Sequence, residues 1–167
     1  FVKYLQSRIL NEEKQERIAG ILKELARVEF TTGDPHYTDY TFYPLGIPRY
    51  FHKLKDLFPV YQDLLIISPF ISKGVIDQFA GLALPNSTGT LITRRTEINK
   101  LVQEQLETFD LYVMKEMVVE GEEGISGEES GIETYQNQDI HAKCYALSQG
   151  SRHQFFIGSA NCTGSAF

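Results

Sequence analysis

The stretch Asp63-Leu64-Leu65-Ile66-Ile67-Ser68 is a short, continuous apolar run, as expected of a strand that is buried on both faces of a sheet. Two similar runs follow at residues 90–93 and 111–114, and residues 73–84 and 96–109 between them have helical patterns. This alternation of strands and helices predicts an α/β domain in which neighbouring strands are parallel and joined by crossover helices.

The sequence before this stretch predicts a different organisation. Over residues 1–29, apolar residues recur at spacings of three and four among many charges, which indicates an amphipathic helix or a helix pair broken near Asn11. Residues 40–43 alternate as a strand does, and residues 48–58 predict a short helix. We therefore expect an N-terminal helical segment over residues 1–35 and an α/β domain over residues 36–167.

The last part of the chain predicts a β-hairpin. Residues 140–147 and 152–157 read as strands, and the turn residues 148–151 separate them. We expect this hairpin to complete a mixed, mostly parallel sheet with helices on both faces. It ends in the small polar turn Gly158-Ser159-Ala160-Asn161.

The composition of the chain limits its domain count and its expected cellular location. The chain has 167 residues with 42% hydrophobic residues, enough for one domain with a real core, and it holds two cysteines. Neither a membrane-spanning run nor a signal peptide is recognisable in the sequence, so we expect a reduced, cytoplasmic location without stable membrane association. Because it begins at Phe1 and ends among small residues, we expect it to be a fragment truncated at the C-terminus.

The formal charge of −6, from 16 basic and 22 acidic residues, argues at first against a nucleic-acid binder. Residues 116–139, however, hold eight of the acidic residues and no Lys or Arg. Without them, 14 acidic residues stand against 16 basic ones, a formal charge of +2. We expect residues 116–139 to form an acidic flexible loop, either a solvated insertion or a lid. The charge therefore does not exclude a phosphate substrate.

Two short patterns carry the candidate chemistry. In a strand, His141, Lys143 and Tyr145 share one face, with the imidazole and the ammonium about 6–7 Å apart at the backbone. A neutral imidazole can attack phosphorus, and an ammonium can hold a phosphate oxygen. The hydroxyl and amide of Ser159 and Asn161 can donate to the same oxygens. The alternating small residues are expected to face a packed helix; these are Ala142, Cys144 and Ala146.

Together these patterns resemble the signature of the phospholipase D superfamily, which is His-x-Lys followed by Gly-Ser-x-Asn at the end of the next strand. The matching residues are His141-Ala142-Lys143 and Gly158-Ser159-Ala160-Asn161. Ser148 occupies the position where the family usually has an Asp that supports the fold around the motif. The earlier segments Ile66–Phe70 and Leu91–Arg94 look like the first half of the family's mixed sheet.

The resemblance implies a metal-independent phosphodiesterase with no cofactor. One His attacks the phosphodiester and forms a phosphohistidine, and a second His protonates the leaving oxygen and then activates water. The family's site needs two such motifs, so the resemblance implies a homodimer or a longer chain with a second half. We expect a nuclease acting on DNA. The alternatives are a phospholipase or phosphatidyl transferase, and a catalytically silent nucleic-acid-binding domain.

Other candidate residues fit less well. A zinc set of His141, Cys144, His153 and Cys162 lacks any Cys-x-x-Cys pair, and a triad of Ser159, His141 and Asp139 would place two members on one strand. Arg94 and Arg95 follow a strand end, where α/β proteins bind ligands, and are candidate substrate phosphate contacts. Arg152 is also expected near the motif.

Overall fold

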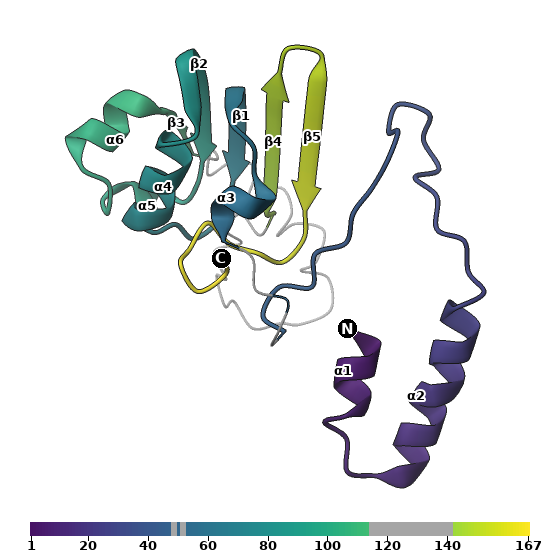
Figure 1. Ribbon diagram of the computed structural model, residues 1–167. Coiled ribbons are helices and arrows are strands. Elements are labelled where there is room, and N and C mark those ends of the chain that lie inside the picture. Colours follow the sequence, from purple (N-terminus) through teal and green to yellow (C-terminus); the bar gives the residue numbers. More distant parts are fainter. Residues whose placement is uncertain (48–49, 51–52, 114–141) are drawn as a thin grey trace, which may run out of the picture. The chain divides into compact units, whose positions relative to one another are not determined.

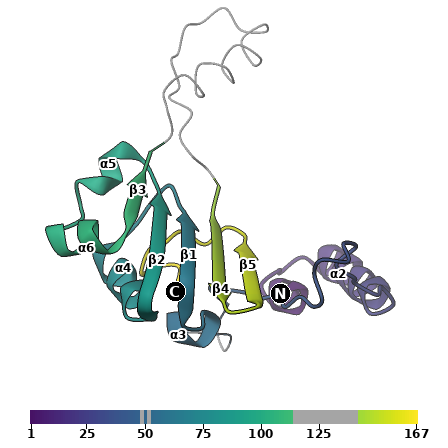
Figure 2. The ribbon, with the colours of Figure 1, turned by 90° about the horizontal axis from the view of Figure 1, so that it is seen from above.

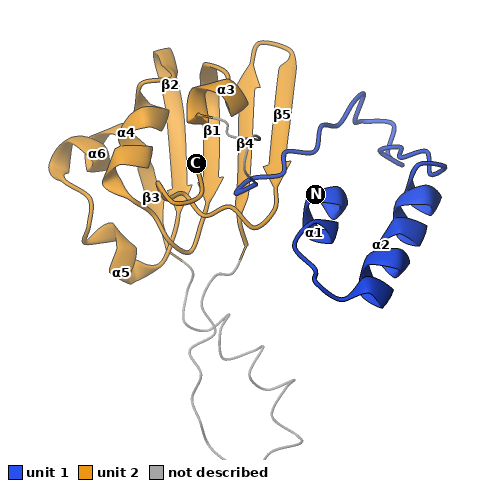
Figure 3. Ribbon diagram, turned by 60° about the horizontal axis from the view of Figure 1, so that its bottom comes forward, with its two compact units in different colours: residues 1–51 blue, residues 52–167 orange. Residues whose placement is uncertain are grey.

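The computed structural model in Figure 1 describes residues 1–47, 50, 53–113 and 142–167 of the chain. The chain divides into two compact units, residues 1–51 and residues 52–167, which Figure 3 distinguishes by colour. Each unit is described separately below.

The first unit contains two helices, α1 (Val2–Gln6) and α2 (Glu12–Leu25), which contact each other. The side chain of Asn11 caps α2 by accepting a hydrogen bond of 2.9 Å from the Lys14 amide, so the predicted helix pair with a break at Asn11 is confirmed. The strand predicted at residues 40–43 is wrong, because no strand of this unit's described residues is available to pair with it.

The second unit is built on a five-stranded sheet in the order β3-β2-β1-β4-β5 (Figure 2). The strands are β1 (Tyr61–Ile67), β2 (Ala83–Ile92), β3 (Asp110–Tyr112), β4 (Cys144–Gln149) and β5 (Arg152–Ile157). β1, β2 and β3 pair in parallel, while β4 pairs antiparallel with both β1 and β5. Four of the five strands thus run in one direction. The predicted α/β class with a mixed, mostly parallel open sheet is confirmed.

Three helices form one layer in this unit: α3 (Leu54–Leu57), α4 (Lys73–Ala80) and α6 (Gln103–Thr108). The layer packs on the face of the sheet that carries Tyr145, whose ring stacks on Phe79 of α4 at 5.7 Å between centroids. Phe58, after α3, joins these buried rings to the half-buried Phe156 of β5 and Phe167 in one aromatic cluster. Burial of such large rings is the main stabilising term of a core of this size.

The opposite face of the sheet differs from the prediction. Its side chains are half-buried or exposed, with Tyr112 57%, Phe155 55% and Ile157 77% exposed, and no second helix layer lies over it in the described residues. The helices therefore pack on the Tyr145 face, and the expectation that they pack on the face of Cys144 and Ala146 is wrong. The small side chains there suggested close packing, but the aromatic ring contributes far more apolar area to the core.

The predicted helix over residues 96–109 is also wrong in extent. It divides into α5 (Arg95–Ile98) and α6, because the side chain of Gln105 accepts from the Val102 amide at 3.1 Å and starts a new helix there. After α6, the ring of Phe109 packs so closely on β2 that a Cβ at Gly89 would lie 2.6 Å from it. Gly89 is thus what allows this helix to approach the sheet.

Two other boundaries shift. α4 ends at Ala80 rather than residue 84, and β2 begins at Ala83 rather than residue 90. Asn86 within β2 has a φ of 63°, and the pairing with β1 shifts register between Tyr61 and Asp63. Pro, Asn and Gly in this strand hide it from a search for apolar runs.

Candidate active site

The candidate site lies at the edge of the sheet where β1, β2 and β5 end. Ile92, Ile67, Cys144 and Ile157 form one continuous row across β2, β1, β4 and β5. The next positions beyond this row therefore meet at the same edge, and these are Thr93, Ser68, Lys143 and Gly158. Ligands of open α/β sheets bind outside the carboxyl ends of the strands, which is this edge.

The structure brings Lys143 next to the turn that begins at Gly158. The Gly158 amide donates to the Lys143 carbonyl at 3.4 Å, which extends the pairing of β4 and β5 by one position. Lys143 is half-buried, and strand alternation places it on the same face as Tyr145. The second half of the predicted His-x-Lys pattern thus adjoins the first residue of the Gly-Ser-x-Asn pattern.

The side chain of Tyr145 contacts this turn. Its hydroxyl donates to the carbonyl of Ala160 at 2.9 Å, and Ala160 lies between Ser159 and Asn161 in the chain. Tyr145 is only 3% exposed, and burial raises the pKa of its phenol. The hydroxyl therefore stays protonated at neutral pH and remains a hydrogen-bond donor. A core residue therefore helps to fix the backbone between two candidate site residues.

The chain after Asn161 is tied to the loop that follows β1. The Cys162 amide donates to the Ser68 hydroxyl at 2.9 Å, and the Ser72 amide donates to the Cys162 carbonyl at 2.8 Å. Cys162 also forms an isolated parallel bridge with Ile71. Because backbone and side-chain hydrogen bonds act together, the Gly158–Asn161 turn is anchored on both sides.

The loop after β1 is itself fixed by a buried acid. Glu97 of α5 is 4% exposed; it accepts from the Ile71 amide at 3.0 Å and forms an ion pair with Lys100. A buried carboxylate is tolerated when it is paired and hydrogen-bonded in this way. Neither Ser68 nor Glu97 was predicted as part of the site, although Ser68-Pro69-Phe70 stands out as a polar break after a buried strand.

Ser159 and Asn161 differ in their surroundings. Ser159 is exposed, whereas Asn161 is half-buried and its amide oxygen Oδ1 is buried without a hydrogen-bond partner among the described residues. A buried acceptor without a donor costs about 1–3 kcal/mol. A ligand group that donates a hydrogen bond to this Asn161 oxygen would remove that cost.

The two arginines after β2 have different surroundings. The guanidinium carbon Cζ of Arg94 lies over the ring of Phe70, 4.2 Å from its centroid. Arg95 is the exposed first residue of α5. Thr93, which precedes them, is fully buried, and its hydroxyl has no hydrogen-bond partner in the described part of the chain. Only Arg94 is therefore held at the edge by a neighbouring side chain.

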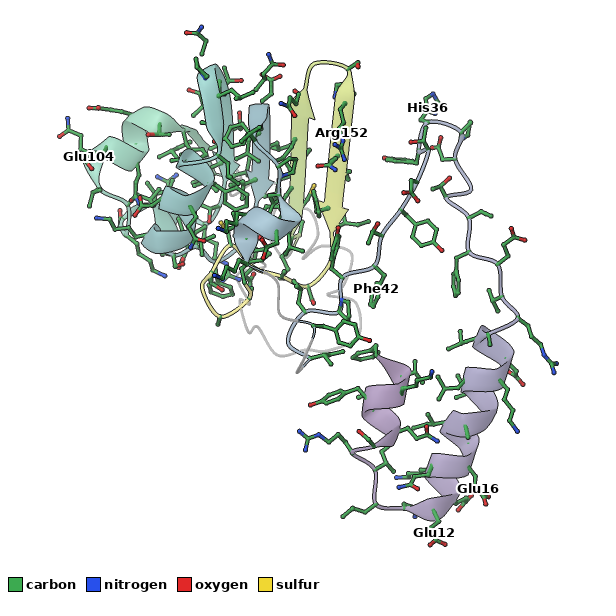
Figure 4. The ribbon with its side chains drawn as sticks, in the orientation of Figure 1. Glu12, Glu16, His36, Phe42, Glu104 and Arg152 are labelled. Carbon is green, nitrogen blue, oxygen red and sulfur yellow. The ribbon has the colours of Figure 1, made fainter. Side chains whose placement is uncertain are left out.

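The remaining predicted residues are Arg152 and those that lie outside the described part of the chain. His141 and the acidic residues 116–139 lie outside the described residues, so the first residue of the His-x-Lys pattern stays a prediction. Arg152 lies at the other end of the sheet, beside the turn between β4 and β5, as Figure 4 shows. Its expected place near the motif is wrong because β5 begins, rather than ends, at Arg152.

Ser148, which takes the place of the family's usual Asp, also lies at that far end. Its hydroxyl donates to Asp63 Oδ2 at 2.6 Å, and Thr88 donates to Asp63 Oδ1 at 2.8 Å. These hydrogen bonds, that of Ser148 first, hold the pKa of the Asp63 carboxyl below its usual range. A carboxylate of β1 therefore lies beside the Ser148 hydroxyl.

Of the residues considered for a zinc set, the structure describes Cys144, His153 and Cys162, and these three are not assembled. Cys162 is buried against Ser68, where burial raises the pKa of its thiol to about 12, while Cys144 lies on the face of β4 opposite Tyr145. Within the described ranges, no three His, Cys, Asp or Glu side chains lie close enough to hold a metal ion. None of the helices that the structure describes is both long and apolar enough to cross a membrane.

Comparison with known proteins returned no match among protein-family models, curated proteins or solved structures.

Proposed function

We propose that this chain is a metal-independent phosphodiesterase of the phospholipase D type, a nuclease that hydrolyses DNA. The observation that carries the proposal is the pairing of Lys143 with Gly158, which sets the ammonium-bearing residue beside the turn that holds Ser159 and Asn161. A cation next to hydroxyl and amide donors suits the non-bridging oxygens of a phosphodiester.

The proposed reaction has two steps. His141, assigned by the motif, attacks the phosphorus, and the bond to the leaving oxygen breaks as a second His protonates that oxygen. Water, deprotonated by the second His, then attacks the phosphohistidine and releases His141 and the phosphate monoester. Lys143, Ser159 and Asn161 would neutralise the charge that develops on the non-bridging oxygens, so that the chemistry needs no metal ion.

The second His has to come from another motif. This chain has one His-x-Lys and one Gly-Ser-x-Asn pattern. We therefore propose a composite site, completed by a second copy of the chain or by a second half of a longer chain. In the first case, activity depends on protein concentration, since the site exists only in the dimer.

DNA is proposed as the substrate on grounds of charge. Outside residues 116–139 the chain has a formal charge of +2. The candidate edge carries Lys143 and Arg94, and only Lys143 is needed for the scissile phosphate. An additional cation beside a phosphodiester site suits a polyanion, because phosphate contacts supply most of the affinity for nucleic acids.

One assay tests the proposal against its alternatives. The protein is incubated in EDTA with plasmid, single-stranded DNA, RNA and phosphatidylcholine vesicles, beside the variants His141→Ala and Arg152→Gln. We expect DNA cleavage that survives EDTA, disappears in His141→Ala and persists in Arg152→Gln, since Arg152 lies at the far end of the sheet.

Other outcomes would contradict the proposal. A requirement for magnesium would exclude the phosphohistidine mechanism. Release of choline or phosphatidic acid from the vesicles, without DNA cleavage, would support the phospholipase. Binding of DNA without turnover of any substrate would support the silent binding domain.

A further inference from the structure

The side chains of Arg94 and Phe70 form a pair at the candidate edge. Arg94 follows β2 and Phe70 follows β1, and the guanidinium carbon lies 4.2 Å from the ring centroid. Phe70 is 41% exposed and Arg94 is half-buried, so the pair lies at the surface rather than in the core. A guanidinium over an aromatic face at this distance is attracted by the ring quadrupole.

This contact prepares Arg94 to bind an anion. A free arginine side chain loses rotamer entropy when it binds, whereas one that already rests on a ring loses less. The planar guanidinium has donors at its rim that match two oxygens of a phosphate, and the ring occupies its face rather than that rim, of which Nε is buried. The pair is thus suited to phosphate recognition.

Arg94 lies apart from Lys143, the residue proposed to hold the scissile phosphate. Thr93, Ser68 and Lys143 occupy neighbouring positions on β2, β1 and β4, so two strand spacings, about 10 Å, lie between the backbones of Thr93 and Lys143. Arg94 comes directly after Thr93. Two cations this far apart at the backbone suit two different phosphates better than they suit one.

We propose that Arg94, held over the ring of Phe70, binds a phosphate adjacent to the scissile one, and that this contact makes the site selective for a polynucleotide over a diester with a single phosphate. The inference rests on the proposed phosphodiesterase function. A polynucleotide offers a second phosphate to Arg94, whereas a single-phosphate diester does not. The selectivity would therefore come from Arg94, and the chemistry from the motif residues.

The test compares two substrates: bis(p-nitrophenyl) phosphate, which has one phosphodiester, and a single-stranded DNA oligonucleotide. Arg94→Gln is expected to lower kcat/KM for the oligonucleotide by about tenfold or more, the loss typical of a charge-assisted contact. The same variant should leave kcat/KM for bis(p-nitrophenyl) phosphate within about twofold. Arg94→Lys, which keeps the charge but not the fork, should lie between wild type and Arg94→Gln.

The chain provides a matched control for charge. Arg95→Gln removes the same charge from the next residue, which is exposed, and we expect it to change neither substrate's kcat/KM by more than about twofold. Phe70→Leu keeps an apolar side chain but removes the ring, and should reproduce part of the oligonucleotide defect. Thermal melting of each variant checks that it is folded. If Arg94→Gln does not fold, the comparison is made with Arg94→Lys instead.

The inference is overturned if Arg94→Gln and Arg95→Gln have equal effects, or if Arg94→Gln lowers kcat/KM for both substrates alike. If the wild type hydrolyses neither substrate, the proposed phosphodiesterase function is contradicted, but the role of Arg94 in binding is still testable. Oligonucleotide binding then decides the role of Arg94: the slope of log K against log salt, which is negative, should become less steep by about 0.7 in Arg94→Gln and be unchanged in Arg95→Gln. An unchanged slope in Arg94→Gln would overturn the inference as well.

Discussion

Tyr145 connects the core to the candidate site through one hydroxyl. Its ring is buried among Phe58, Phe79 and Phe167, and its oxygen holds the Ala160 carbonyl at 2.9 Å. Tyr145→Phe keeps the ring and removes this hydrogen bond, so we expect a loss of only about 1 kcal/mol in the free energy of unfolding. We expect a larger effect on activity, about tenfold in kcat, because the turn that carries Ser159 and Asn161 loses one of its anchors.

Tyr61→Phe is the matched control. Tyr61 is 1% exposed, and it lies at the start of β1, away from the edge that carries the turn. Both variants are measured by urea unfolding and by steady-state kinetics on an oligonucleotide. If Tyr145→Phe loses stability but keeps the wild-type kcat, Tyr145 has a structural role only.

At this scale the sequence predicts some site residues and misses others. Lys143, Ser159 and Asn161 are predicted because their spacing along the chain resembles a known pattern. Ser68 and Ser72 are missed because their partners, Cys162 and Gly164, follow them by more than 90 residues. A hydroxyl that accepts from so distant an amide leaves no local signal, so such a contact becomes visible only once the strands are in register.

Three strands are connected by a single carboxylate at the far end of the sheet. Asp63 of β1 accepts from Ser148 of β4 and from Thr88 of β2. Its lowered pKa means that Asp63 contributes stability above the unfolded-state pKa, and that this contribution is lost as the pH falls through the folded-state pKa. In Asp63→Asn, we expect urea midpoints between pH 7 and pH 3 to fall less steeply with acidification than in wild type.

Ser148→Asp, which creates the family's usual residue, gives a sharper test of the same arrangement. Asp63 and position 148 are direct cross-strand partners, so the variant places two carboxylates opposite each other. We expect a lower urea midpoint than wild type at pH 7, with a smaller deficit near pH 4, where one carboxyl takes up a proton. Adding Asp63→Asn should restore the midpoint at pH 7. A Ser148→Asp protein as stable as wild type would contradict this account.

The elements themselves were predictable in type and less so in extent. Apolar runs identify β1 and the end of β2, which hold buried residues, because a strand with neighbours on both sides needs little polar sequence. They also identify the half-buried β3. They do not show which face of β4 meets the helices, since that depends on whether α4 presents its aromatic ring to Tyr145 or to Cys144. Nor do they show the division between α5 and α6, which depends on the Gln105 side chain at the amide of Val102.

For the whole molecule, the distribution of charge matters more than its sum. The formal charge of −6 arises from residues 116–139, whose eight acidic residues precede the candidate motif directly in sequence. If the edge around Lys143 binds DNA, these charges oppose that binding through the long-range field of the protein. The strength of this opposition depends on ionic strength, because charges more than a Debye length apart are screened.

Deletion of residues 120–134 tests this electrostatic effect. The deletion removes six acidic residues and no basic one, which brings the formal charge from −6 to zero. We expect DNA to bind about three- to tenfold more tightly at low salt, and the gain to shrink toward physiological salt, where the Debye length is about 8 Å. A full-length variant with the six glutamates changed to Gln should show the same gain, because it loses the charge and keeps the segment. If only the deletion tightens binding, the segment opposes DNA by its bulk; if neither variant does, its charge has no influence on the candidate edge.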